Sequence, residues 1–238
     1  MTVFHDLLRL QEHDSAVDRL RHRRQNLPEA AELRAVEDEI ARLEATLAEV
    51  GARAGEAARA QRRVEDELAS VEAKIAELDR RLYSGAVTIP RELQAMQAER
   101  ESLRARRSSL EDGVLEAMGE REPLDEEVAR LEGRRRELDA EGSRLRAAVA
   151  EAEAAIDKEL AAEIEARAAA AASIPDDLRT LYEQLRPRLD GVAAAPLVNG
   201  RCGGCHLALP ATEVDRLRRE PPDALVRCDQ CGRILVRP

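Results

Sequence analysis

The amino-acid sequence predicts a mainly α protein, in which a long antiparallel two-helix coiled-coil hairpin is followed by a small β-rich domain held together by four cysteines. Three observations lead to this prediction. From residue 33 to residue 82, apolar residues recur in alternating steps of four and three, with Gln61 as the one exception, and this is the period of a coiled coil. Turn-forming residues interrupt the helical pattern at 83–90, and two CxxC pairs follow residue 200.

The apolar rows on the two sides of the turn mirror each other. After the turn, one leucine-type position recurs every seven residues: Met96, Leu103, Leu110, Ala117, Leu124, Leu131, Leu138 and Leu145. When the chain is folded at the turn, Leu78 lies opposite Met96 and Val36 opposite Leu138, and the residue numbers of either pair add up to 174. A constant sum is expected of an antiparallel hairpin within one chain, whereas a parallel homodimer would place each row opposite itself.

The composition supports a coiled coil rather than a large globular core. Aromatic residues make up 1% of the chain and charged residues 36%. The formal net charge of −10 argues against a general affinity for nucleic acid. The sequence contains no signal-peptide pattern and no apolar run long enough to span a membrane, so we expect a cytoplasmic protein. In that reducing compartment, paired cysteines indicate metal ligands rather than disulfides.

The two CxxC pairs are the most specific signal in the sequence. Cys202 and Cys205 form the first pair, and Cys228 and Cys231 form the second. Two such pairs predict a tetrahedral four-cysteine site for one Zn²⁺, and because thiolates fill all four positions the ion is structural rather than catalytic. A redox pair is the alternative, but there are two pairs and no βαβ pattern surrounds them. His206 follows directly, yet four thiolates suffice without it.

We expect three parts along the chain. Residues 1–173 form the coiled-coil hairpin with its turn at 83–90, residues 174–191 form a short connecting helix and linker, and residues 192–238 form the C4-type zinc ribbon. Pro123 lies inside the returning helix and is expected to kink it, because proline lacks a backbone donor. A ribbon of about 45 residues is too small for a core without a metal. We expect little shared core, so that chelation unfolds the ribbon and leaves the hairpin helical.

Arginine occupies four positions of the returning helix where the heptad pattern calls for an apolar residue: Arg100, Arg107, Arg121 and Arg135. In one interpretation the aliphatic stems lie along the partner helix while the guanidinium groups reach solvent or glutamate partners. In the other interpretation, the four arginines form a polar groove for a partner helix.

Two sets of residues are candidates for binding a partner. The first is the hairpin tip with Tyr83, Pro90 and Arg91, whose pattern is more specific than a turn requires. The second is a group of ribbon arginines that would contact phosphates: Arg201, Arg216, Arg218, Arg219 and Arg233. Seven arginines against five acidic residues give the segment 197–238 a net charge of only +2, and it contains no aromatic residue to stack on a base.

No enzyme signature is present in the sequence. It contains no Gly-rich phosphate loop, no serine elbow and no HExxH motif. We therefore expect a non-enzymatic adaptor that binds macromolecular partners in transcription or its regulation. The alternative is a nucleic-acid-binding protein that acts through the zinc ribbon on RNA or DNA. In either case the chain is expected to be a monomer or a homodimer through the coiled coil.

The sequence resembles the bacterial C4-type zinc-ribbon proteins that carry an N-terminal coiled-coil hairpin. Three stretches carry the resemblance: 82–96 around the turn, 174–182 after the hairpin, and 202–235 around the cysteines. The resemblance implies a helical hairpin with a zinc ribbon at its base and the four cysteines as zinc ligands. Studied relatives act as adaptors that bind an alternative sigma factor, a flagellar messenger RNA or secretion components, which implies a partner in the transcription or secretion machinery.

Overall fold

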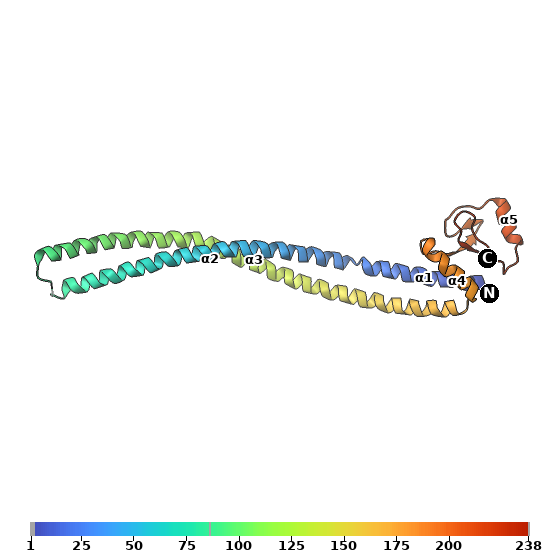
Figure 1. Ribbon diagram of the computed structural model, residues 1–238, viewed down its shortest axis with the longest axis horizontal. Helices are drawn as coiled ribbons and strands as arrows, with labels where there is room; N and C mark the ends of the chain where they lie inside the picture. Colours follow the sequence, from blue (N-terminus) through green and yellow to red (C-terminus); the bar gives the residue numbers. More distant parts are fainter. Residues whose placement is uncertain (1–2, 86, 238) are drawn as a thin grey trace. The chain divides into compact units, whose positions relative to one another are not determined.

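The computed structural model describes residues 3–85 and 87–237. The predicted fold class is confirmed, because a long helical hairpin precedes a small sheet (Figure 1). The helices are α1 (Val3–Gln25), α2 (Pro28–Tyr83), α3 (Pro90–Ala172), α4 (Asp176–Leu185), the 3-10 turn η1 (Arg186–Arg188) and α5 (Ala211–Arg219). The strands are β1 (Ala194–Val198), β2 (Arg201–Cys202) and β3 (Ile234–Val236). Among the described residues, no helix has the length and apolar character needed to cross a lipid bilayer.

The described chain divides into two compact units. The coil unit comprises residues 33–144, and the ribbon unit comprises residues 3–32 and 145–237. The domain boundaries predicted from the sequence stay predictions, because α2 and α3 each contribute residues to both units.

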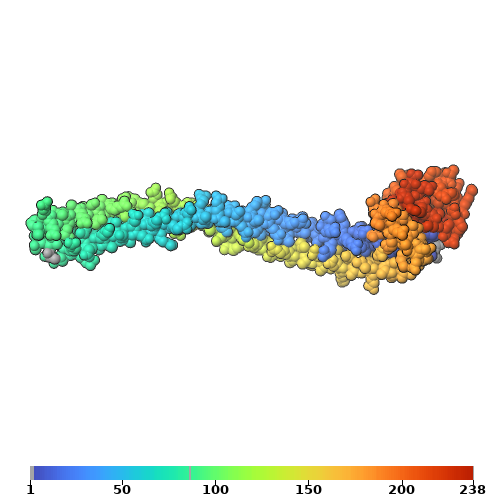
Figure 2. All heavy atoms as spheres, in the orientation of Figure 1, coloured from blue at the N-terminus to red at the C-terminus, as the bar shows by residue number. Residues whose placement is uncertain are grey.

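In the coil unit, α2 and α3 run antiparallel and lie against each other in the space-filling view (Figure 2). Two ion pairs establish the direction: Glu39 contacts Arg134 at 2.8 Å and Glu67 contacts Arg106 at 3.1 Å. A step of 28 residues up α2, from 39 to 67, thus corresponds to 28 residues down α3, from 134 to 106. The side chains buried between the two helices are apolar residues of the predicted rows: Val36, Val50, Ala54, Ile75, Leu78, Met96, Leu110, Leu131 and Leu138.

The arginines in the apolar rows are paired with carboxylates, as the first interpretation expects of their guanidinium groups, and the packing of their aliphatic stems along the partner helix stays a prediction. Arg100 Nη1 contacts Asp79 at 3.3 Å, and Arg135 contacts Glu44 at 2.8 Å and Asp139 at 3.2 Å. The other two pair along their own helix, Arg107 with Glu111 and Arg121 with Asp125. Because these pairs are at least partly exposed to solvent, each is expected to contribute little to stability.

Two local features predicted from the sequence are the turn at 83–90 and a kink at Pro123 of α3. The predicted turn covers 83–90, of which Ala86 lies outside the described residues. Gly85 has a φ of 73°, a left-handed conformation that favours glycine. α3 is one uninterrupted helix through Pro123, so the proline does not end the helix and the predicted kink stays a prediction.

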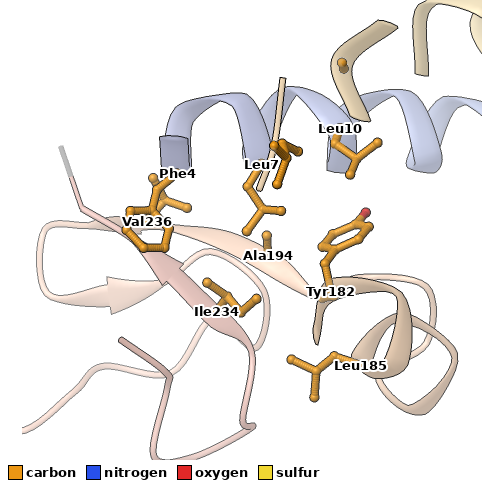
Figure 3. Close-up of a cluster of buried hydrophobic side chains, with 11 residues drawn as sticks. Phe4, Leu7, Leu10, Tyr182, Leu185, Ala194, Ile234 and Val236 are labelled. Carbon is orange, nitrogen blue, oxygen red and sulfur yellow. The ribbon is translucent and has the colours of Figure 1, made fainter. Parts of the chain in front are cut away.

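The ribbon unit is built on a three-stranded sheet in the order β2-β1-β3. β1 pairs antiparallel with β2 and parallel with β3, with Ala194 opposite Ile234 in the parallel register. Figure 3 shows α1 lying across these strands, with Phe4 and Leu7 directed toward them and Leu10 above Tyr182 of α4. The same core includes Tyr182 and Leu185 of α4 and Val236 of β3.

This shared core contradicts the expectation that the ribbon and the hairpin have largely separate cores. Leu7 of α1 and Ile234 of β3 are both completely buried in one cluster, and Ala170 near the end of α3 belongs to it as well. The sheet is too small to cover its own face, so the first helix of the chain covers it. The sequence analysis also missed β2 and α5, which lie inside the ribbon.

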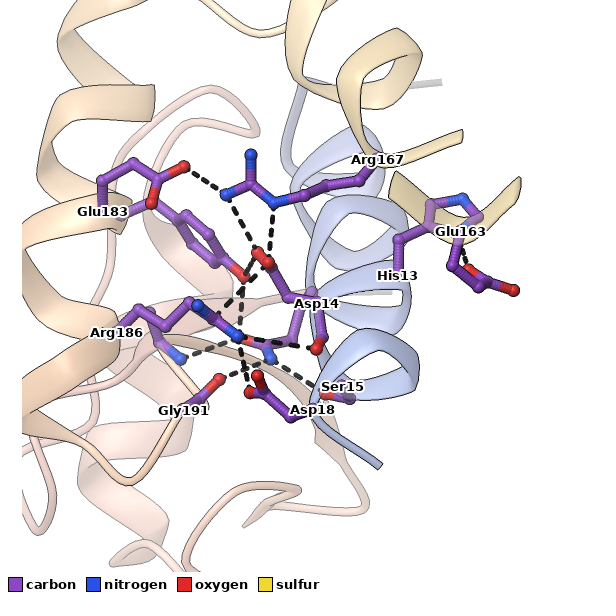
Figure 4. A network of polar contacts seen from close by, with 12 residues as sticks. His13, Asp14, Ser15, Asp18, Glu163, Arg167, Glu183, Arg186 and Gly191 are labelled. Carbon is purple, nitrogen blue, oxygen red and sulfur yellow. Dashed lines mark hydrogen bonds and ion pairs between the residues drawn. The ribbon is translucent and has the colours of Figure 1, made fainter. Parts of the chain in front are cut away.

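A buried carboxylate joins α1, α3 and α4 (Figure 4). Asp14 of α1 is only 2% exposed. Its oxygens accept hydrogen bonds from Arg167 Nε at 2.7 Å and from the Tyr182 hydroxyl at 2.7 Å. Arg186 Nε lies 3.6 Å from Asp14 Oδ1, and Arg186 Nη2 contacts Asp18 Oδ2 at 2.5 Å. A buried charge is tolerated when it is paired and hydrogen-bonded, as it is here, and removal of one partner is strongly destabilising.

Gln11, one helical turn before this carboxylate, ties α1 to the strand that leads into the ribbon. Its side-chain oxygen accepts hydrogen bonds from the backbone N–H of Ala193 at 2.7 Å and of Ala194 at 3.3 Å. Its amide nitrogen donates to the Gly191 carbonyl at 2.9 Å and to Ser15 at 3.0 Å. This one side chain thereby satisfies two buried backbone N–H groups at the start of β1.

The shared core predicts that a change in α1 weakens the zinc ribbon. Leu7→Ala removes a completely buried side chain and should lower the free energy of unfolding by about 2–5 kcal/mol. We expect zinc release to a chromogenic chelator to occur at a lower denaturant concentration, shifted as far as this loss of free energy of unfolding predicts. Ile164→Ala, at a site of α3 that is 44% exposed, serves as the control and should change little. Zinc release that is unaffected by Leu7→Ala would contradict the shared core.

Tyr182 is expected to stay protonated for as long as the protein is folded. Burial raises its pKa, and the hydrogen bond to Asp14 raises it further. An unfolded tyrosine ionises at about pH 10, so above that pH the folded state retains more protons and its stability falls as pH rises. In Tyr83→Phe, where Tyr182 is the only tyrosine, tyrosinate absorbance should appear only together with loss of the helical circular dichroism signal. Ionisation at about pH 10 in a fully helical protein would refute this assignment.

Candidate metal centre

The four cysteines predicted as ligands converge on one point. Their sulfur atoms all lie within 4.8 Å of one another. The Cys202 and Cys231 sulfurs are 3.9 Å apart, and so are those of Cys205 and Cys228. Four thiolates at Zn–S distances of about 2.3 Å in a tetrahedron have sulfurs about 3.8 Å apart, so the spacing fits zinc. With four protein ligands no position is left for a water or substrate, which makes the site structural.

Each CxxC pair lies in a tight turn closed by backbone hydrogen bonds. In the first, the N–H of His206 donates to the Cys202 carbonyl at 2.8 Å. In the second, the N–H of Gly232 donates to the Cys228 carbonyl at 2.7 Å, and Gly232 has a φ of 74°. His206 itself has a φ of 62°, so it serves as a turn residue after the first pair. Four cysteines supply the predicted ligand set without it.

The two glycines inside the first pair leave room for close packing. A Cβ on Gly203 would come within 2.9 Å of the Pro196 ring, and a Cβ on Gly204 within 2.3 Å of the Arg233 side chain. Arg233 donates from Nε to the Val192 carbonyl at 2.8 Å and from Nη2 to the Leu189 carbonyl at 3.0 Å. Arg233 therefore fixes the second turn against the linker and passes over the first turn.

The protein environment shifts the pKa values of Cys202, Cys228 and Cys231 in different directions. Burial raises the pKa of the Cys202 thiol, and burial likewise raises the pKa of Cys228 to about 12. Burial also acts to raise the pKa of Cys231, but hydrogen bonds from the Arg233 backbone and side chain and from neighbouring thiols outweigh it and lower that pKa to about 7. Zinc binds thiolates, so metal binding must release protons from Cys202 and Cys228, the thiols whose pKa is raised. Zinc affinity therefore falls as pH falls.

The ribbon arginines predicted to contact nucleic acid do not form one free group. Arg201 and Arg219 are exposed, and the structure shows no ion pair for either of these described residues. Arg216 is paired with Glu213, and Arg218 lies 3.9 Å from Asp215. Arg233 donates to backbone carbonyls, as described above. Their binding to nucleic acid stays a prediction.

The predicted residues of the hairpin tip lie together at the end of the coil unit. The Tyr83 side chain is 79% exposed, and its hydroxyl accepts a hydrogen bond from Arg100 Nη1 at 3.3 Å. Pro90 begins α3 and Arg91 follows it, both exposed. Ile89, which the sequence analysis did not single out, is a further exposed apolar side chain here.

The sequence analysis also missed Gln11 and Asp14, which hold the ribbon on α1. A signal for them was present, because both polar residues fall within the apolar stripe of α1 that contains Leu7, Leu10 and Val17. Polar residues inside such a stripe either have a buried partner or face solvent. Here the partners of Gln11 and Asp14 lie more than 150 residues away in the sequence, so the sequence pattern alone does not identify them.

The fold and the metal centre define a coiled-coil hairpin protein with a C4 zinc ribbon, and comparisons with known proteins agree. The model of the CT398-like coiled coil hairpin domain matches residues 10–190, and the model of the C4-type zinc ribbon domain matches residues 201–235. The chain belongs to the family of proteins with a CT398-like coiled coil hairpin domain.

The relatives share nearly the whole length of the chain. An uncharacterized protein of Mycobacterium tuberculosis, found in two strains, is 30% identical over 231 residues, which are 97% of this chain and 94% of that one. A solved Mycobacterium smegmatis structure has a TM-score of 0.87 at 30% identity and covers 99% of this chain and 97% of its own. The structure of CT398 from Chlamydia trachomatis has a TM-score of 0.68 at 20% identity over 99% and 98% of the two chains, which shows the fold.

The metal centre predicts one zinc ion per chain. Elemental analysis of protein purified without added metal should give about one equivalent, and Cys228→Ser should abolish tight binding. Because the strands share their core with α1, chelation should increase amide hydrogen exchange in the ribbon and in α1, while residues 33–144 keep their protection. Two disulfides in place of the metal, or a chelated protein in which α1 stays fully protected, would contradict this account.

Proposed function

We propose that the protein is a non-enzymatic adaptor that binds a protein partner through the hairpin tip. The observation that carries the proposal is the exposure of Tyr83. The chain has three aromatic residues, and the other two, Phe4 and Tyr182, are buried in the core of the ribbon unit. Tyrosines at the centre of protein interfaces often contribute much of the binding energy, so an exposed and oriented one is a suitable anchor.

The surroundings of Tyr83 support this role. The hydrogen bond from Arg100 restrains the ring, so less conformational entropy is lost when a partner covers it. Ile89, six residues further along in the same turn, is 59% exposed and adds apolar area to the tip. The zinc site supports the absence of enzymatic activity, since its four ligand positions are filled by thiolates. Paired cysteines that serve as metal ligands suit the reducing cytoplasm, where we place the adaptor. In line with the family resemblance, we place its role in transcription or its regulation.

The alternative function, nucleic-acid binding through the ribbon, has weaker support. Of the five ribbon arginines, Arg233 is engaged by carbonyl groups, and Arg216 and Arg218 lie beside carboxylates of their own helix. Arg201 and Arg219 remain to contact phosphates. Two such contacts give little affinity at physiological salt.

The two functions separate in one set of measurements. We expect crosslinked pull-down from a lysate of the source organism to recover a defined protein with the wild type, and to lose it with Tyr83→Ala combined with Ile89→Ala. Ile164→Ala, which also removes an exposed apolar side chain from this chain, should retain the partner. A partner that is recovered equally by the tip variant would refute the role of the tip.

Titration of the full chain with mixed RNA and duplex DNA at several salt concentrations tests the alternative. We expect no binding at micromolar concentrations. Tight binding with a steep salt dependence, reduced by Arg201→Ala and Arg219→Ala, would instead establish the nucleic-acid function.

A further inference from the structure

The ribbon unit contains an apolar groove that neither the metal centre nor the hairpin tip uses. It lies between the first turn of α1, the start of α4 and the loop that follows α5, and its volume is about 490 Å³. Its apolar lining comes from all three segments: Val3, Phe4, Pro175, Leu178, Leu181 and Leu225. Ligand sites in proteins are typically concave and mostly apolar with a small number of polar groups, and the groove has this character.

The groove is open at the surface of the ribbon unit. Leu225 is 46% exposed and Val3 is 37% exposed, whereas Phe4 in the same lining is 8% exposed. Pockets for small molecules typically enclose about 70–90% of the ligand surface. An open groove with exposed apolar side chains suits instead a few side chains that a larger partner presents.

Hydrogen bonds hold both walls of the groove in place. On one side, the guanidinium group of Arg237 donates to three backbone carbonyls of segment 220–224, which fixes the loop that carries Leu225. On the other side, the bond from the Tyr182 hydroxyl to Asp14 fixes α4 on α1. A site whose walls are ordered before binding loses less conformational entropy when it is occupied.

The charges of the groove indicate the chemistry of its occupant. The charged residues of the lining are Asp177 and Asp223, which are both exposed, and neither makes an ion pair within the described part of the chain. Asp177 lies in the first turn of α4, where the helix dipole favours a carboxylate, but Asp223 lies in a loop and receives no such support. Two carboxylates beside an apolar surface are complementary to a partner that carries a cation next to an apolar side chain.

We propose that this groove is a docking site for a segment of a partner protein that presents a large apolar side chain next to an arginine or lysine. The apolar side chain packs on Phe4, Leu181 and Leu225, and the cation pairs with Asp177 and Asp223. The inference does not rest on the role of the tip, because the groove belongs to the ribbon unit and the tip to the coil unit. With both sites, each compact unit has one docking surface, so that one chain can join two partners.

Selection from a phage library of random peptides on the full zinc-loaded protein tests the proposal. We expect the enriched peptides to share a large apolar residue within a few positions of an arginine or lysine. Synthetic copies that carry a fluorescent label should bind the protein in solution. Their affinity should fall as the salt concentration is raised, because the two carboxylates of the groove are exposed.

Variants of the lining show whether the peptides bind in the groove. Leu225→Ser should weaken binding by about tenfold, because an apolar contact with the peptide is lost. Asp177→Asn combined with Asp223→Asn should weaken binding by about fivefold at low salt and should make it less dependent on salt, because the attraction for the cation is removed.

Each variant has a matched control in the ribbon unit. Leu207→Ser removes a leucine that is 53% exposed outside the groove, and Asp176→Asn removes a carboxylate that is paired with Arg179 and does not line it. Both controls should bind the peptides as the wild type does. Tyr83→Ala combined with Ile89→Ala should also bind them unchanged, which tests the groove apart from the tip. Circular dichroism and zinc content verify that all variants remain folded.

A selection that enriches no peptide, or only peptides without a basic residue, would overturn the proposal. Peptides that Leu225→Ser binds as tightly as the wild type does would also overturn it. A wild type that is dimeric in sedimentation velocity and becomes monomeric in Leu225→Ser would show that a second copy occupies the groove in place of a partner protein.

Discussion

The sheet formed by β1, β2 and β3 is too small to bury an apolar core of its own, and the rest of the structure depends on the interactions that stabilise it. Metal ligation supplies part of this stability, because one ion holds together the two turns that carry Cys202 and Cys228. Helix α1 supplies the rest through Leu7 and Leu10, which are completely buried against the strands and α4. The core of the ribbon unit therefore forms only when residues from near the two ends of the chain pack together.

Sequence reasoning predicted the features that depend on local periodicity. The heptad rows located α2, the turn and α3, and the CxxC spacing located the ligands. It did not predict that Leu7 would share a core with Ile234, because the spacing of apolar residues in α1 suits a coiled-coil partner and a sheet equally well. It missed α5 because this helix of nine residues buries only Leu217, which leaves too little periodicity to detect. The partners of Asp14 depend on tertiary folding and leave no local pattern.

The two units distribute their stability differently. In the coil unit the buried side chains form a thin double row, and ion pairs such as Arg135 with Glu44 supplement it. Each contact there contributes little, so substitutions should be tolerated one at a time. In the ribbon unit the side chains of Asp14 and Gln11 each bond several partners in different parts of the chain, and Arg233 bonds two carbonyl groups of the linker. Removing one of them leaves buried groups unpaired, so a single change there is costly.

This difference bears on how such a protein presents binding surfaces. A hairpin with a thin apolar row cannot enclose a pocket, and what it offers a partner is surface along its helices and at its turn. Because the coil residues Tyr83 and Leu115 take no part in the buried rows, selection can change them without unfolding the hairpin. The residues of the zinc ribbon have no such freedom, since Gly203, Gly204 and Arg233 pack against one another and the linker. Partner choice can therefore vary in the coil while the ribbon remains fixed by its metal and its shared core.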